Sequence, residues 1–274
     1  MPPLKRNPLD WDLGNVPPGI AWGGVDEAGR GAWAGPVVAA CAVLDPDTVK
    51  KWGHVLRGAR DSKKLSPERR EALAAELKLA LPAWSVAEVD NLGIDRENIL
   101  QATLEAMRQS VTSVKSKPKI LFVDGNCAPR SGIPERLLVE GDSLSCAIAC
   151  ASILAKTHRD ALMRDLDPIY PVYGFARHKG YGTPEHQKAL KEHGACGIHR
   201  ISYAPVAAVQ QLDESIWEIL LEELDTHRDV DELQAWVNTK LRHSYGALKS
   251  SWVDDLRDRY AQKLASLALG SGIP

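Results

Sequence analysis

The sequence has no Cys-x-x-Cys pair and no apolar run that is long enough to cross a membrane. Its five cysteines are scattered, and only Cys146 and Cys150 lie one helical turn apart, in an apolar segment. Buried thiols are therefore expected rather than a zinc site or disulfides. The longest near-continuous apolar stretch, 146–155, is too short for a bilayer, and the first residues lack the apolar region of a signal peptide. These absences argue against a membrane protein and predict a cytoplasmic one.

A strong net charge is also absent, because 34 lysines and arginines nearly balance 36 aspartates and glutamates. This balance argues against a simple basic coat for nucleic acid. The acidity is concentrated at one end: residues 1–210 carry 27 basic and 24 acidic side chains, whereas residues 211–274 carry 7 and 12. The first segment can therefore bind nucleic acid through a local patch, and direct DNA contact is not expected of the second.

Two adjacent carboxylates, Asp26 and Glu27, end an apolar strand pattern and precede a glycine-rich turn. Adjacent carboxylates repel each other when both are ionised, so a positive charge in reach, most simply a divalent cation, is expected. In the turn, Gly29 and Gly31 let the backbone approach a ligand closely, and Arg30 offers charge-assisted hydrogen bonds to phosphate. Taken alone, these residues also fit an ordinary surface turn with solvated acids.

Strand and helix signals alternate through the first 210 residues. Ser66 is a predicted helix cap with proline next to it, and Asp95 is the predicted cap of the following helix. The first two strands are expected to pair antiparallel, because a short glycine-rich turn joins them. The predicted strands cover 20–27, 36–44, 83–89, 119–124 and 136–140, and the predicted helices cover 67–80, 95–114 and 142–163.

This order predicts an α/β fold with a mixed sheet flanked by helices and a C-terminal helical extension. We expect an irregular, proline-rich arm at 1–18, the layered domain at 19–210 and the acidic helical extension at 211–274. The apolar residues of the extension recur with a helical period. Its three tryptophans fall on these stripes and are interpreted as packing residues, against the layered domain: Trp217, Trp236 and Trp252.

Two further carboxylates stand at the ends of predicted elements. Asp124 follows a short apolar strand, and Asp142 opens an apolar helix, so one sheet edge can collect both of them with Asp26 and Glu27. Taken singly, Asp124 and Asp142 fit a cap equally well. Ligand sets of oxygen alone favour Mg²⁺ or Mn²⁺, and two such ions about 4 Å apart would support phosphodiester hydrolysis.

Several motifs resemble bacterial ribonuclease HII, in family order over about residues 20–208. They are Asp26-Glu27-Ala28-Gly29-Arg30-Gly31, Ala34-Gly35-Pro36-Val37, Asp61-Ser62-Lys63-Lys64-Leu65, Val123-Asp124-Gly125-Asn126, Gly141-Asp142, Ala151-Ser152-Ile153-Leu154-Ala155-Lys156, His178-Lys179-Gly180-Tyr181-Gly182-Thr183, His199-Arg200 and Ser202. The resemblance implies an RNase H-like fold. It also implies an endonuclease that cuts RNA in RNA–DNA hybrids and cuts 5′ to single ribonucleotides embedded in duplex DNA.

By this resemblance the metal-binding catalytic acids are Asp26, Glu27, Asp124 and Asp142. The turn of Gly29, Arg30 and Gly31 matches the family element that contacts the 2′-hydroxyl and neighbouring phosphates. Tyr181 matches the tyrosine that packs on the adjoining deoxyribose and helps to sense the RNA-to-DNA junction. An aromatic ring packed on a sugar disfavours an extra hydroxyl at the contact. The protein would therefore recognise the chemistry of the sugar rather than the base sequence. Lys63 and Lys179 stand inside matching motifs and are candidate substrate contacts.

The sequence departs from the family pattern at four positions. Ala32-Trp33 stand where Pro-Leu is common after Gly-Arg-Gly, and Glu140 and Leu144 stand where lysine is frequent. The missing positive charges near Asp142 put metal affinity and phosphate contact in question. Four histidines are expected to be structural or to face substrate rather than to bind metal: His178, His186, His193 and His199.

Three alternatives remain open at this point. The Glu140 and Leu144 departures fit a protein that binds hybrids without cutting them. Ribonuclease HIII resembles the same core but usually carries an additional N-terminal domain. The acidic extension fits a docking module for a protein partner, and the enzyme itself is expected to be a monomer.

Overall fold

The computed structural model describes residues 7–59, 65–209, 214–241 and 250–270. Within these residues, five strands form one sheet in the order β3-β2-β1-β4-β5. The strands are β1 (Trp22–Ala28), β2 (Val37–Leu44), β3 (Ala83–Val89), β4 (Ile120–Asp124) and β5 (Glu135–Leu138). β1 pairs antiparallel with β2 and parallel with β4, so the predicted mixed sheet and its antiparallel first pair are confirmed.

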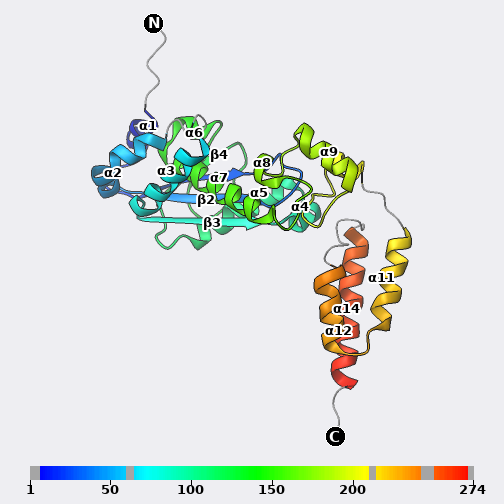
Figure 1. Ribbon diagram of the computed structural model, residues 1–274. Helices are drawn as coiled ribbons and strands as arrows, with labels where there is room; N and C mark the ends of the chain where they lie inside the picture. The colour runs from blue at the N-terminus through cyan, green and yellow to red at the C-terminus, as the bar shows by residue number, and fades with distance from the viewer. Residues whose placement is uncertain (1–6, 60–64, 210–213, 242–249, 271–274) are drawn as a thin grey trace.

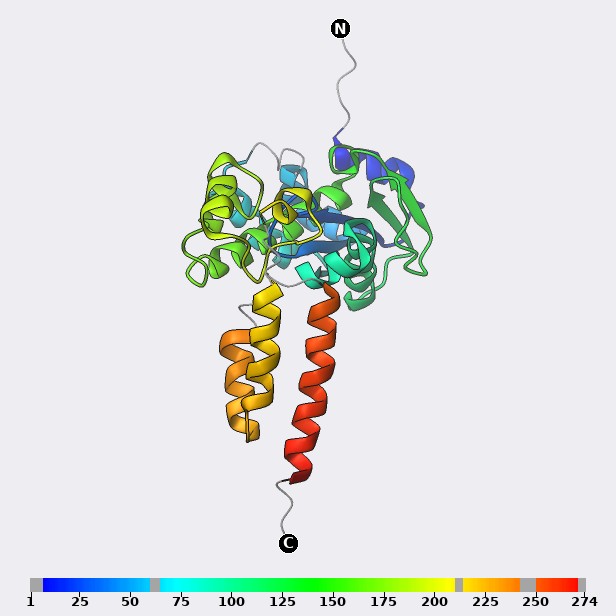
Figure 2. The ribbon, with the colours of Figure 1, turned by 90° about the vertical axis from the view of Figure 1, so that its right-hand side faces the viewer.

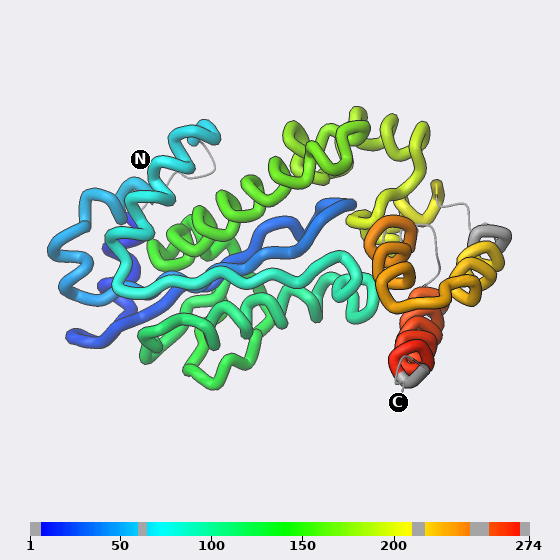
Figure 3. Tube along the Cα trace, turned by 60° about the horizontal axis from the view of Figure 1, so that its bottom comes forward, coloured from blue at the N-terminus to red at the C-terminus, as the bar shows by residue number. Residues whose placement is uncertain are grey.

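Helices cover both faces of this sheet (Figure 1). The ten helices described before residue 210 are α1 (Pro8–Asn15), α2 (Pro46–Gly58), α3 (Pro67–Ala80), α4 (Asn91–Glu97), α5 (Ile99–Ser113), α6 (Gly141–Leu144), α7 (Cys146–Leu166), α8 (Phe175–His178), α9 (Pro184–His193) and α10 (Ala204–Ala207). The long helix α7 lies on one face of the strands and α5 on the other (Figure 3). Each face has its own buried apolar cluster.

Close packing of α7 on β1 depends on a strand residue without a side chain. A Cβ on Gly24 would lie 2.0 Å from the Ala147 carbonyl carbon and 2.2 Å from the Ile148 nitrogen. Real atoms do not approach this closely, so only glycine lets the helix lie this near the strand. This contact sets the position of the β1 end, which carries Asp26 and Glu27.

The N-terminal arm differs from its prediction, because part of it is the helix α1 rather than an irregular segment. Asn7 caps this helix by accepting a hydrogen bond from the Leu9 amide at 3.0 Å, and proline occupies the first helical position. Asp12, fully buried, accepts hydrogen bonds from the Trp22 indole at 3.1 Å and from the Ala147 amide at 2.9 Å. One carboxylate therefore joins the arm to both β1 and α7.

Asp12 makes the stability of the fold depend on pH. Burial raises the pKa of this carboxyl from 3.8 to about 6. The charged form is thus disfavoured in the folded chain, so the group destabilises the fold above pH 6 and ceases to do so below about pH 4. We expect Asp12→Asn to be more stable than the parent at pH 8, with a difference that shrinks by about 3 kcal/mol on going to pH 4. Urea unfolding of both proteins across this range measures the effect, and a constant difference would contradict it.

Two further predictions of local structure are wrong. Asp95 does not cap a helix: Asp90 caps α4 and Asn98 caps α5, while Asp95 accepts hydrogen bonds from the distant Ile201 and Ser202 amides. The helix predicted over 142–163 is broken at Ser145, whose extended backbone separates α6 from α7. In both cases side-chain capping of a new helix start outweighs the continuous helical pattern.

The C-terminal extension is helical as predicted. It contains α11 (Glu214–Thr226), α12 (Val230–Trp236), the π-helical η2 (Val237–Leu241) and α14 (Ser250–Gly270), and it projects from the layered domain (Figures 1 and 2). These helices share an apolar cluster of their own, in which the Trp217 and Trp252 rings stack 5.2 Å apart. The predicted packing role of the tryptophans holds, but their partners lie in the extension. None of the described helices is both long and apolar enough for a membrane span.

Candidate active site

Three of the predicted carboxylates meet at one edge of the sheet. β1 and β4 run parallel in adjacent positions, with Val25 beside Val123, so both strands deliver their terminal acids to the same place. One carboxylate oxygen from each of Asp26, Glu27 and Asp124 lies within 4.8 Å of the other two. Asp26 is buried, and the other two side chains are half-buried.

The electrostatics of this cluster favour a cation. Burial, followed by the charges of Glu27 and Asp124, raises the pKa of Asp26 well above its usual value. Burial also raises the pKa of Glu27, although Arg30, at 3.2 Å, opposes that shift. The three acids therefore hold more negative charge than their surroundings neutralise. Oxygen donors with this excess charge fit Mg²⁺ or Mn²⁺ better than zinc.

Asp142 lies next to these three acids, but its carboxylate is not among the oxygens that lie within 4.8 Å of one another. It is 7% exposed, in the first turn of α6. The preceding residue, Gly141, donates its backbone amide to the Asp124 carboxylate at 2.6 Å. The α6 start is thus tied directly to the cluster. The two departures flank it: Glu140 is the left-handed residue before the helix, and Leu144 is 40% exposed at its end.

The glycine-rich turn is shaped by a buried arginine beneath it. Gly29 has a φ of +94°, and a Cβ there would lie 2.0 Å from the Arg159 Nε atom. Arg159 is fully buried and donates hydrogen bonds to the carbonyls of Pro36, Lys179 and Ala34 at 2.8–3.0 Å. Glycine at position 29 therefore serves both the backbone conformation and the packing of this cation.

An open cleft of about 460 Å³ lies along the turn and next to the acids. Three positively charged side chains and one aromatic ring line it with the glycine-rich turn. The lining residues are Glu27, Ala28, Gly29, Arg30, Gly31, Arg70, Ser152, Ile153, Lys156 and Tyr181. Positive charge beside an acidic cluster is the arrangement that a phosphodiester requires, since its phosphates need cations and its hydrolysis needs metal ligands.

Tyr181 is held next to the end of the glycine-rich turn. It forms an antiparallel bridge with Ala32, and the Lys156 Nζ and Arg159 guanidinium each lie 5.4 Å from its ring centroid. The Trp33 indole packs against Gly182, the residue after Tyr181. A Cβ on Gly182 would lie 2.2 Å from this indole. The departures Ala32 and Trp33 therefore support the Tyr181 segment.

The two predicted lysines have different outcomes. Lys63 lies outside the described residues. Lys179 is not among the residues that line the cleft: its ammonium donates to the Ala176 carbonyl, and its own carbonyl accepts from Arg159. The structure thus places Lys179 in support of the Tyr181 segment rather than beside the acids.

Sequence reasoning missed several residues of the cleft. Ser152 donates a side-chain hydrogen bond that lowers the pKa of Asp26 against the effect of burial. Lys156, named in the sequence analysis only as part of a motif, reaches Tyr181 and forms a 2.7 Å ion pair with Asp160. Ser152 and Lys156 are four residues apart on α7, so their shared helical face was a usable signal. Arg70 carried no comparable signal.

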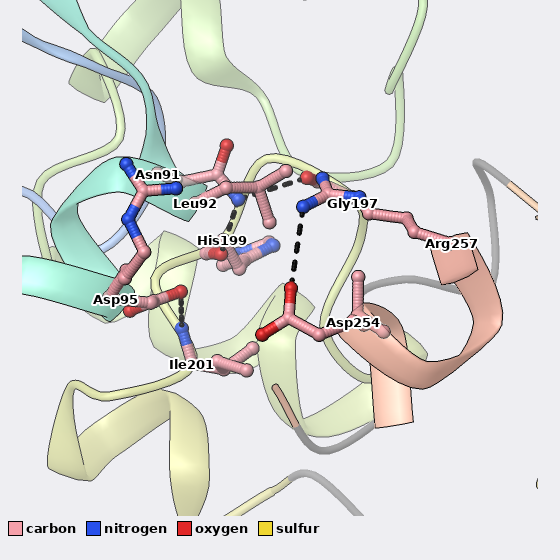
Figure 4. Close-up of a pocket in the computed structure, with 10 residues that line it drawn as sticks. Asn91, Leu92, Asp95, Gly197, His199, Ile201, Asp254 and Arg257 are labelled. Atoms are coloured by element: carbon pink, nitrogen blue, oxygen red, sulfur yellow. Dashed lines mark hydrogen bonds and ion pairs between the residues drawn. The ribbon is translucent and has the colours of Figure 1, made fainter. Parts of the chain in front are cut away.

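A second hollow, of about 70 Å³, lies between α4 and α14 (Figure 4). It shares no lining residue with the cleft. The polar groups around it bond to one another, including Asn91 to the Gly197 carbonyl and Arg257 to Asp254. We assign no chemistry to this hollow.

Comparison with known proteins points to one family. Residues 23–206 match the family model described as Ribonuclease HII. A Polaromonas protein named Ribonuclease HII is 48% identical over 205 residues, which cover 75% of this chain and 98% of that protein.

Two solved structures are also similar. The ribonuclease H2 of Pyrococcus horikoshii aligns with a TM-score of 0.62 and 26% identity, over 69% of this chain and 97% of that one. A chain in the structure of the PCNA:RNase HII complex of Archaeoglobus fulgidus aligns with a TM-score of 0.54 and 29% identity, over 63% and 88%.

Proposed function

This chain belongs to the ribonuclease HII family of metal-dependent ribonuclease H enzymes, and from that premise we propose that it cuts 5′ to single ribonucleotides in duplex DNA as well as within RNA–DNA hybrids. Such a cut would initiate ribonucleotide removal. The observation that carries the proposal is the convergence of three carboxylates beside a cleft lined by Arg30, Lys156 and Tyr181.

The proposed metal ligands are Asp26, Glu27, Asp124 and Asp142. The first three fit a divalent cation because their oxygens converge and because burial and mutual repulsion raise the pKa of Asp26. A pair of Mg²⁺ or Mn²⁺ ions would supply the charge that activates an attacking water and stabilises a leaving oxygen. The Gly141 amide fixes the orientation of Asp124, and the Ser152 hydroxyl fixes that of Asp26.

The proposed substrate contacts lie along the rest of the cleft. The Gly29 to Gly31 turn is shaped for close backbone approach to a 2′-hydroxyl, and Arg30 and Lys156 stand where phosphates would pass. The half-buried Tyr181 ring offers a flat apolar face for the sugar of the next nucleotide. Together these groups would read the sugar and the backbone but no base edge.

A cleavage assay on a uniform RNA–DNA hybrid tests the reaction class. With each strand labelled in turn, we expect cuts in the RNA strand in Mg²⁺ or Mn²⁺, none in chelator and none in the DNA strand. Binding measured in parallel by fluorescence anisotropy identifies the alternative. Tight binding with no product in either metal would overturn the proposal and favour a hybrid-binding protein.

The Leu144 departure yields a quantitative prediction. Leu144→Lys adds a cation in the turn that follows Asp142, at a position already 40% exposed. One added phosphate contact should lower KM by about threefold and steepen its salt dependence by about one counterion. Ile219→Lys is the matched control, because it adds the same charge at a 48% exposed position of the extension. Equal effects of the two substitutions would show that the charge does not act at the cleft.

The extension from residue 211 is proposed to be a unit that docks a protein partner. Its helices bury their own apolar cluster, and its surface is acidic, which suits a basic partner better than DNA. The proposed enzyme is a monomer in which residues 19–210 carry the reaction. Deletion of the extension should then leave turnover intact, and a large loss of turnover would contradict this division.

A further inference from the structure

Two buried histidines form a hydrogen-bonded chain that ends on the backbone of Tyr181. His186 and His199 are 0% and 1% exposed. The His186 Nδ1 atom lies 3.0 Å from the Tyr181 carbonyl oxygen, and the His186 Nε2 atom lies 3.0 Å from the His199 Nε2 atom. At the far end, the Cys196 amide donates to His199 Nδ1 at 2.9 Å.

The donors and acceptors of this chain fix every proton in it. The Cys196 amide is a donor, so His199 Nδ1 must accept and the proton of this ring sits on Nε2. His199 Nε2 then donates to His186 Nε2, which leaves the proton of His186 on Nδ1, aimed at the Tyr181 carbonyl. Burial lowers the pKa of His186 to about 4 and that of His199 to about 3, so both rings are neutral near pH 7.

The chain is built into two segments that pair with each other through isolated β-bridges. Ala32 bridges Tyr181 and Ala34 bridges His199, so the residues after Gly31 pair with both ends. His186 belongs to the first turn of α9, where its own amide is held by the Thr183 hydroxyl. The Thr183 amide also donates to the Tyr181 carbonyl, at 2.8 Å, so Thr183 and the His186 ring hold the same carbonyl from α9.

We propose that His186, oriented by His199, is a positioning residue: it fixes the Tyr181 backbone, and so the position of the Tyr181 ring against the sugar of the substrate. The inference rests on the proposed function, since it assigns Tyr181 to the sugar. His186 touches no substrate and no reacting atom; it acts through the Tyr181 backbone.

Two amide substitutions at position 186 separate this role from general packing. The amide nitrogen of asparagine overlaps Nδ1 of histidine, so His186→Asn keeps a donor for the Tyr181 carbonyl. Glutamine reaches the Nε2 position instead, so His186→Gln keeps the contact with His199 and loses the donor. On a duplex with one ribonucleotide, we expect kcat/KM to fall about tenfold in His186→Gln and to stay within about threefold of the parent in His186→Asn.

The same two substitutions are repeated in a Tyr181→Ala background. If His186 acts through the ring, the glutamine variant causes no further loss of kcat/KM once the ring is gone. Equal losses in the asparagine and glutamine variants, or an undiminished glutamine effect without Tyr181, would overturn the inference. Absence of cleavage by the parent protein would instead refute the proposed function.

A spectroscopic measurement keeps the inference testable if a variant fails to fold. Nitrogen NMR shifts of the parent protein at pH 7 should show His186 protonated on Nδ1 and His199 protonated on Nε2. The opposite neutral tautomer of His186, with its proton on Nε2, would remove the donor to the Tyr181 carbonyl and with it the proposal.

Discussion

Asp124→Asn should abolish cleavage while the protein stays folded. The amide keeps an oxygen that can accept the Gly141 amide hydrogen bond, which is 2.6 Å long in the parent, but the side chain loses its charge at the proposed metal site. Loss of several kcal/mol of transition-state stabilisation corresponds to a fall in kcat of roughly a thousandfold. Single-turnover cleavage of a hybrid in saturating Mn²⁺ measures the loss directly.

The same substitution should raise stability when metal is absent. Asp124 contributes to the repulsion that raises the pKa of Asp26, so a neutral side chain relieves it. In chelator, Asp124→Asn should melt at or above the temperature of the parent, whereas added Mn²⁺ should stabilise only the parent. Asp12→Asn is the control, since it neutralises a buried carboxylate outside the cleft and should leave cleavage intact. Cleavage by Asp124→Asn within tenfold of the parent would refute the role of this acid.

Gly29→Ala should destabilise the fold by about 2–4 kcal/mol. Alanine at a φ of +94° is strained, and its methyl group would overlap the Arg159 side chain at 2.0 Å. Arg159 cannot move without losing its hydrogen bonds to the backbone carbonyls of Pro36, Lys179 and Ala34. Cleavage should therefore fall by more than about tenfold even below the melting temperature. Urea unfolding and steady-state kinetics provide the two readouts.

Gly31→Ala is the matched comparison within the same turn. A Cβ on Gly31 meets nothing within 4 Å, and its φ lies outside the left-handed region. The free energy of unfolding of Gly31→Ala should stay within about 0.5 kcal/mol of the parent value, as for other surface substitutions. If the two alanine variants are equally stable, Arg159 does not hold the turn in the way described.

Much of the fold was predictable because its signals are local. The helix at 67–80 starts at a serine cap followed by proline, and the strand at 83–89 has a clear β pattern; both agree with the structure residue for residue. The continuous helix predicted over 142–163 was wrong although its signal is local, because Ser145 caps a new helix there. The prediction at Asp95 was wrong for a different reason. Asp95 bonds to backbone amides more than a hundred residues away, which no local pattern can reveal.

The candidate site also has one part that was predictable from the sequence and one part that was not. The meeting of Asp26, Glu27 and Asp124 follows from strand ends in one sheet, and the structure brings these three together as predicted. The supporting contacts were beyond the sequence, because Arg159 and His186 bond to carbonyls of segments that only the tertiary fold brings near, and His199 bonds to the His186 ring. At Lys179 the motif predicts a substrate contact, which stays a prediction, and the structure adds a bond from its ammonium to the Ala176 carbonyl that the sequence does not reveal.

The most direct test of the account is cleavage of an end-labelled DNA duplex that contains one ribonucleotide. It is run with Mg²⁺, Mn²⁺ or chelator, beside an all-DNA duplex and a uniform hybrid. We expect a single metal-dependent cut 5′ to the ribonucleotide and no cut in the all-DNA duplex. Metal-dependent cutting of the hybrid with none at the single ribonucleotide would contradict the assignment of Gly29 to Gly31 and Tyr181 to junction recognition. No cut in any substrate would contradict the nuclease itself.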